Sequence, residues 1–117
     1  MSLKFYQCEK CKQVVICKDG CTLSGLTELV PCSTDAAKEK HVPVVTKKCK
    51  SVKVDVGSVA HPMTEEHFIE WVVLETEKGW QIKYLKPGEE PVCTFSLGDD
   101  KAVRVYAYCN LHGLWAE

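Results

Sequence analysis

The chain has 117 residues, 45% of them hydrophobic and 26% charged, which suits one compact domain or one domain with a small appendage. Its net charge of −1 argues against general nucleic-acid binding, which usually requires a basic chain. No apolar run reaches the roughly 18–20 residues of a membrane span, and the first residues lack the apolar stretch of a secretory signal. We therefore expect a soluble cytoplasmic protein with no nucleic-acid or membrane partner.

Cysteine is abundant in the first third of the chain. Of eight cysteines, five fall within residues 1–34, namely Cys8, Cys11, Cys17, Cys21 and Cys32. Without an export signal, clustered cysteines indicate metal binding or redox chemistry more than a disulfide framework. The uneven placement predicts two regions, a Cys-rich module at 1–34 and a second domain at 35–117.

The second region has the pattern of short strands. One helical turn is expected at 35–40, before Pro43. Strands are expected at 51–56, 67–76, 80–84, 92–97 and 102–109, with turn residues at 77–79, 86–88 and 97–100. Short strands at such regular spacing predict an all-β fold, an antiparallel β-sandwich.

Possible metal ligands lie near the ends of these predicted strands. They are the four histidines of the chain and one cysteine: His41, His61, His67, His112 and Cys109. His61 and His67 would share a face if the backbone between them were extended, but Pro62 makes a loop equally plausible. Imidazole and thiolate donors favour iron, copper or zinc and disfavour magnesium and calcium.

Three kinds of metal protein fit this donor set to different degrees. A blue-copper carrier uses two imidazoles, one thiolate and usually an axial methionine, yet no methionine follows Cys109. A structural zinc in an interaction module takes four ligands and leaves one donor unexplained. Five donors fit a redox iron with one open position. A blue-copper or rubredoxin-like electron carrier remains the alternative to an enzyme.

Three motifs resemble the superoxide reductase family, which includes neelaredoxin and desulfoferrodoxin. They are Glu39-Lys40-His41-Val42-Pro43, then His61-Pro62-Met63 with His67, then Cys109-Asn110-Leu111-His112-Gly113. The resemblance runs from about Asp35 to the end of the chain. It implies an immunoglobulin-like sandwich with one non-haem iron, bound by four planar imidazoles (His41, His61, His67, His112) and axial Cys109. The implied reaction is one-electron reduction of superoxide to hydrogen peroxide, with a rubredoxin-type electron donor.

The same resemblance assigns roles to two residues beside His41. Lys40 is similar to the family's catalytic lysine, and Glu39 to the glutamate that closes the open iron position in the oxidised state. Residues 38–53 carry six lysines and one glutamate, a net charge of +5 in a chain of net −1. This positive segment could steer superoxide, or its lysines could protect a strand edge. We also expect a homo-oligomer, a dimer or tetramer.

The N-terminal region resembles desulforedoxin, in which a Cys-x-x-Cys and an adjacent Cys-Cys pair bind a second iron. Residues 4–11 resemble its start and residues 28–32 its end, but Pro31 replaces the first cysteine of the adjacent pair. Cys17 or Cys21 would have to supply the missing thiolate. We therefore expect a degenerate module without a working second iron centre of this type. A zinc or an altered iron site at these cysteines is the open alternative.

Overall fold

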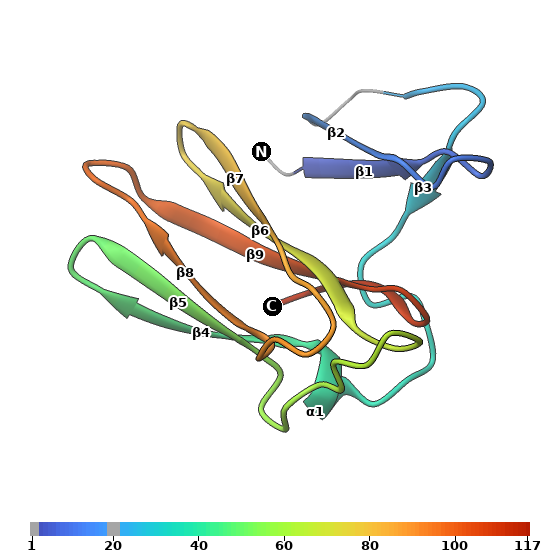
Figure 1. Ribbon diagram of the computed structural model, residues 1–117. Helices are drawn as coiled ribbons and strands as arrows, with labels where there is room; N and C mark the ends of the chain where they lie inside the picture. Colours follow the sequence, from blue (N-terminus) through green and yellow to red (C-terminus); the bar gives the residue numbers. More distant parts are fainter. Residues whose placement is uncertain (1–2, 19–21) are drawn as a thin grey trace. The chain divides into compact units, whose positions relative to one another are not determined.

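The structure, a computed structural model, describes residues 3–18 and 22–117 (Figure 1). It divides into two compact units, Met1–Val30 and Pro31–Glu117. Within the described ranges, no helix has the length and apolar character needed to cross a membrane.

The first unit is a small antiparallel sheet. Its strands are β1 (Leu3–Gln7), β2 (Val14–Lys18) and β3 (Thr27–Leu29), in the order β2-β1-β3. Phe5 in the central strand pairs with Ile16 on one side and Leu29 on the other. The sequence analysis did not predict these strands, which are too short for a clear alternation of apolar and polar residues. Residues 8–13 connect β1 to β2 and hold the Cys-x-x-Cys motif.

The second unit is an antiparallel β-sandwich, as predicted (Figure 1). One sheet has the order β10-β9-β6-β7 and the other β4-β5-β8. The elements are α1 (Lys38–His41), β4 (Pro43–Lys48), β5 (Ser51–Val56), β6 (Ile69–Thr76), β7 (Gly79–Tyr84), β8 (Val92–Ser96), β9 (Ala102–Cys109) and β10 (Gly113–Ala116).

The core between the two sheets follows from the alternation in the sequence. Every second residue of β5 is apolar and buried, beginning with Val52, and the facing sheet supplies Leu74, Val105 and Ala107. Fully burying an aliphatic side chain of this size contributes about 1.5–3 kcal/mol. Cys109 belongs to the same core and is the last residue of β9, so the core fixes the position of its thiol.

The structure differs from the sequence prediction at four elements. The helical turn lies at Lys38–His41, later than the expected 35–40, and β6 begins at Ile69 because residues 67 and 68 belong to the preceding loop. Strands β4 and β10 were not predicted. Strand β4 begins with Pro43 and ends in exposed lysines, a composition that is tolerated at a sheet edge but is not typical of a strand. Strand β10 has only four residues, too few for a clear alternation.

The loop after β5 packs tightly against α1 at Gly57. A Cβ atom added to Gly57 would lie 2.6 Å from the carbonyl oxygen of Glu39 and 3.0 Å from that of Val42. The same Glu39 carbonyl accepts a hydrogen bond from the backbone N–H of Val59 at 2.8 Å. Only a residue without a side chain fits there, and the contact fixes the one-turn helix that ends at His41.

We predict that Gly57→Ala lowers the free energy of unfolding by about 1–3 kcal/mol, because the added methyl group forces the backbone of α1 to move. Urea denaturation of the two proteins measures the difference. Val59→Ala is the matched control: Val59 is half exposed, so its truncation should change stability by less than about 0.5 kcal/mol. Equal stability of Gly57→Ala and the parent chain would show that the contact is not tight.

Candidate metal centre

The predicted ligands meet at one end of the sandwich. His41 ends α1, His61 and His67 lie in the loop between β5 and β6, and Cys109 ends β9. Their four donor atoms all lie within 4.8 Å of one another. The strand registers explain this convergence, since the first residue of β4 pairs with the last of β5, and the first of β6 pairs with Cys109.

His112 lies beside this group, in the turn between β9 and β10. Its Nδ1 is 3.1 Å from His41 Nε2 and 3.8 Å from Cys109 Sγ. Five candidate donors are therefore close together, four of them imidazoles.

The four imidazole rings stand around a common centre. Going around through His41, His61, His67, His112 and back, neighbouring ring centroids are 4.6, 4.6, 5.0 and 4.9 Å apart. The diagonal from His41 to His67 is longer, at 6.3 Å. Four nearly equal sides and a longer diagonal describe a square of rings, with consecutive rings close to perpendicular.

Backbone carbonyls fix the tautomers of two of these rings. His41 Nδ1 lies 2.6 Å from the carbonyl oxygen of Ala37, and His61 Nδ1 lies 2.7 Å from that of Pro62. A carbonyl only accepts, so each Nδ1 carries the proton and each Nε2 presents a lone pair. Those two Nε2 atoms face each other at 3.1 Å. Two buried acceptors at this distance have no proton to share, and a cation between them satisfies both.

The ring of His67 also has a buried nitrogen that needs a partner. His67 Nε2 is buried and has no hydrogen-bond partner among the described residues. Leaving such an atom unpaired costs about 1–3 kcal/mol. Two nitrogens bound at right angles to one ion, each at about 2.1 Å, would lie about 3 Å apart, close to the observed spacing. These residues therefore fit a metal ion bound at the centre of the square.

Burial prepares these side chains for metal binding. Desolvation lowers the pKa of His41 and His67, and lowers the pKa of His61 to about 4. The rings of His41, His61 and His67 therefore favour the neutral form at pH 7, which is the form that binds metal. Burial raises the pKa of the Cys109 thiol, so without a metal the thiol keeps its proton, and binding a metal releases it.

Two supporting residues were missed by the sequence analysis. The Asn110 side chain accepts from the Phe68 N–H at 2.9 Å and donates to the Glu66 carbonyl at 3.0 Å, so it grips both neighbours of His67. Trp115 stacks on the His41 ring at 4.9 Å and donates from Nε1 to the His112 carbonyl at 3.0 Å. The position of Asn110 inside the Cys-Asn-Leu-His motif was the available signal. No sequence pattern identified Trp115.

Lys40 and Glu39 are exposed on α1, directly before His41. The positive charge of Lys40 contributes to lowering the pKa of His41 and of His67, which places its field at the site. For Glu39, the backbone carbonyl accepts hydrogen bonds from Val59 N–H and from the Ser58 hydroxyl, the latter at 3.3 Å.

The N-terminal cysteines are divided between the two units of the chain. Cys8 and Cys11 lie in the connection between β1 and β2, and Cys17 lies in β2. Cys32 belongs to the second unit, where its thiol donates to the carbonyl oxygen of Ala116 at 3.6 Å. Cys21 falls outside the described residues.

Comparisons with known proteins agree with this geometry. A family model described as Desulfoferrodoxin matches residues 33–117. The desulfoferrodoxin of Desulfarculus baarsii is 42% identical over 97% of this chain and 94% of that protein. The superoxide reductase of Pyrococcus horikoshii is 37% identical over 71% of this chain and 88% of its own. The crystal structure of the superoxide reductase from Treponema pallidum superimposes with a TM-score of 0.87 at 42% identity, covering 100% of this chain and 99% of that one.

We predict that Asn110→Ala weakens ferrous-ion binding about tenfold or more, because the loop carrying His67 loses its attachment to the turn carrying His112. Competition with a chromophoric chelator measures the affinity. Leu111→Ala is the matched control: Leu111 is 60% exposed, so its truncation should leave the affinity unchanged. Equal affinities for the Asn110→Ala variant and the parent chain would remove Asn110 from the support of the site.

Proposed function

This chain belongs to the desulfoferrodoxin family, and we propose that its active site is one iron bound by four histidines and one cysteine. The chain is a superoxide reductase, and its reaction consumes one superoxide, one electron and two protons and forms one hydrogen peroxide. The observation that carries the proposal is the square of four imidazoles, in which His41 and His61 are buried and the nitrogens at the centre lack a proton donor.

In this proposal His41, His61 and His67 bind through Nε2, His112 binds through Nδ1, and Cys109 binds through its thiolate. The short distances from His112 Nδ1 to His41 Nε2 and to Cys109 Sγ support including it as the fifth ligand. A blue-copper site would use two of the four imidazoles and leave the other two rings without a role. A structural zinc would use four of the five donors.

Each group has a distinct part in the reaction. A ferrous ion held by these residues would supply the electron, and the Cys109 thiolate would make that electron easier to release. The ammonium group of Lys40 attracts the superoxide anion, and its N–H donors stabilise the charge that grows on the substrate as the electron arrives. The lysines between residues 38 and 53 add to this positive field. Glu39, exposed beside Lys40, would supply a carboxylate ligand to the oxidised metal.

The remaining parts of the proposal concern the partners and the N-terminal region. The electron donor is a rubredoxin-type protein, the active form is a homodimer or homotetramer, and the location is the reducing cytoplasm. A degenerate desulforedoxin-like module lies within residues 1–34 and the iron-binding sandwich within residues 35–117, while the compact units themselves meet between Val30 and Pro31. Pro31 in place of a cysteine, together with the hydrogen bond from the Cys32 thiol to Ala116, supports the absence of a second iron centre.

We predict that the chain binds one iron and that its oxidised form has a visible thiolate-to-iron charge-transfer band. Cys109→Ser should abolish the band, because a serine oxygen does not give that transition, whereas Cys49→Ser should keep it, since Cys49 is an exposed turn residue. Metal analysis and absorption spectra give both results. A chain that takes up copper or zinc stoichiometrically and refuses iron would contradict the assignment.

We predict that Lys40→Ala slows the second-order reaction with superoxide about tenfold while iron binding stays intact, because Lys40 supplies charge and not a ligand. Pulse radiolysis across a salt series measures the rate. The rate of the parent chain should fall as salt increases, since screening limits the field to about 8 Å at physiological ionic strength. Lys40→Arg should keep most of the rate. Identical salt profiles for Lys40→Ala and the parent chain would make Lys40 a bystander.

A further inference from the structure

Two cysteines outside the metal centre lie together in one tight turn. Cys8 and Cys11 belong to the connection between β1 and β2. The Lys12 N–H donates to the Cys8 carbonyl at 2.8 Å, and the Cys8 N–H donates to the Gln13 carbonyl at 2.9 Å, so the backbone of the turn is closed. Cys8 and Cys11 are three residues apart inside this turn, and the Cys11 backbone nitrogen lies 3.5 Å from Cys8 Sγ, so the two residues are close in space. Disulfides require Cα separations of about 4.4–6.8 Å.

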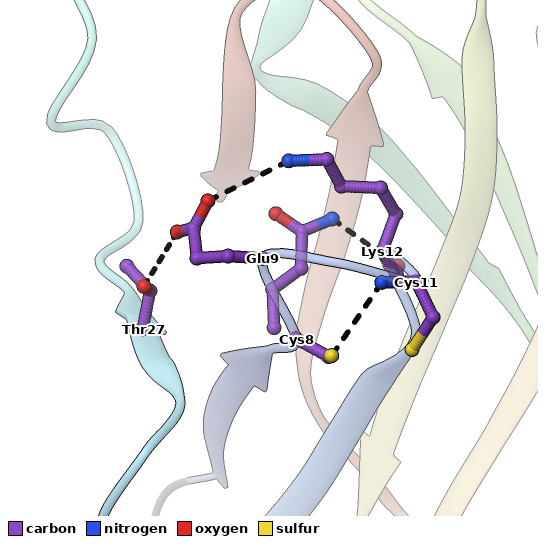
Figure 2. A network of polar contacts seen from close by, with 6 residues as sticks. Cys8, Glu9, Cys11, Lys12 and Thr27 are labelled. Atoms are coloured by element: carbon purple, nitrogen blue, oxygen red, sulfur yellow. Dashed lines mark hydrogen bonds and ion pairs between the residues drawn. The ribbon is translucent and has the colours of Figure 1, made fainter.

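The turn also polarises one of the two sulfurs. Figure 2 shows the backbone N–H of Cys11 directed at Cys8 Sγ, a contact of 3.5 Å. The Cys11 backbone, the Cys11 side chain and the Lys10 backbone all lower the pKa of the Cys8 thiol by hydrogen bonding. A lowered pKa increases the thiolate population at neutral pH, and the thiolate is the reactive form.

The acidic neighbour of Cys8 is restrained by two partners. The Glu9 carboxylate opposes the lowering of the Cys8 pKa by charge repulsion. It is itself bound by the Thr27 hydroxyl at 2.5 Å and by the Lys12 ammonium at 3.5 Å (Figure 2). The hydrogen bond from Thr27 and the positive charge of Lys12 stabilise the ionised carboxylate, and so they lower the pKa of Glu9. The pKa of the Cys8 thiol is therefore lowered overall, which favours the thiolate.

Both thiols are accessible. Cys11 is exposed and Cys8 is partly exposed, so a small oxidant reaches them without any opening of the fold. In residues 3–18 and 22–117, the donor cluster close enough to hold a metal is the one at His41, and it does not include these two cysteines.

We propose that Cys8 and Cys11 form a peroxide-sensitive dithiol, a second redox function of this chain, which closes to a disulfide in the presence of the hydrogen peroxide that the metal centre makes. The source of the oxidant rests on the superoxide reductase activity. The dithiol chemistry itself needs only hydrogen peroxide.

The reaction has two balanced steps. The Cys8 thiolate attacks one oxygen of hydrogen peroxide, the O–O bond breaks, and hydroxide leaves, so Cys8 becomes a sulfenic acid. The Cys11 thiol then attacks the Cys8 sulfur, the S–O bond breaks, and the hydroxyl group leaves as water. Overall, two thiols and one hydrogen peroxide give one disulfide and two waters, with two electrons passing from sulfur to oxygen.

The test uses the full-length, iron-loaded chain, reduced and freed of reductant, with one equivalent of hydrogen peroxide added. We expect a mass lower by two hydrogen atoms, a Cys8–Cys11 disulfide by peptide mapping, and full reversal with dithiothreitol. Cys11→Ser should stop at a sulfenic acid on Cys8, trapped by dimedone, and Cys8→Ser should give neither product. Cys49→Ser, which removes a single exposed thiol elsewhere, should behave as the parent chain.

Several results would overturn the proposal. They are a disulfide between different cysteines, a disulfide between two chains, oxidation of Cys8 beyond the sulfenic acid in the parent chain, or no change with added peroxide. Thiols at Cys8 and Cys11 that react with a thiol reagent only after a chelator removes a bound metal would also overturn it.

The Cys109→Ser variant separates this proposal from the metal-centre assignment. It should lose superoxide reduction yet still form the Cys8–Cys11 disulfide with added peroxide. If added peroxide leaves the dithiol unchanged while superoxide reduction is normal, the dithiol proposal fails and the reductase assignment stands. If the disulfide forms but no superoxide is reduced by the parent chain, the reductase assignment fails and the dithiol stands.

Discussion

The site depends on buried nitrogen lone pairs that face one another. The carbonyls of Ala37 and Pro62 hold the protons of His41 and His61 on the outer side of the rings, so both inner nitrogens are acceptors 3.1 Å apart. In water each such nitrogen would accept a hydrogen bond from solvent, whereas here both nitrogens are buried and burial also makes the charged imidazolium costly. The fold therefore keeps an unfavourable arrangement that a metal ion relieves, and metal binding stabilises the folded chain.

The sandwich contributes rigid strand ends to this arrangement. Cys109 and the start of β6 are paired in one sheet, and the starts and ends of β4 and β5 are paired in the other, so the ligand-bearing loops leave neighbouring positions. The loops then need their own attachments. Asn110 supplies one beside His67, and the close packing of Gly57 against α1 supplies another beside His41.

The sequence predicted the elements whose side chains alternate regularly. The buried valines of β5 and the apolar run of β6 are strong signals, since one or both faces of those strands meet the core. Strand β4 was missed because its exposed, lysine-containing end has the composition of a loop. Its strand conformation comes from pairing with β5, which the local sequence does not show. The even spacing of His61 and His67 was not the cause of their proximity: both lie in a loop, and tertiary contacts through Met63 and Asn110 set its path. The candidate ligands could be named from the motifs. The backbone carbonyls that orient the rings could not, because any residue type can supply a carbonyl.

The stacking of Trp115 on the His41 ring makes the site optically visible from inside the fold. Trp115 is one of three tryptophans, and its ring centroid lies 4.9 Å from that of a ligand imidazole. A metal centre that absorbs light accepts energy from an excited indole at that distance. The fluorescence of Trp115 is therefore quenched when the centre is filled. Metal uptake by the purified chain can thus be followed in stopped-flow mixing through its own tryptophan fluorescence, without any added dye.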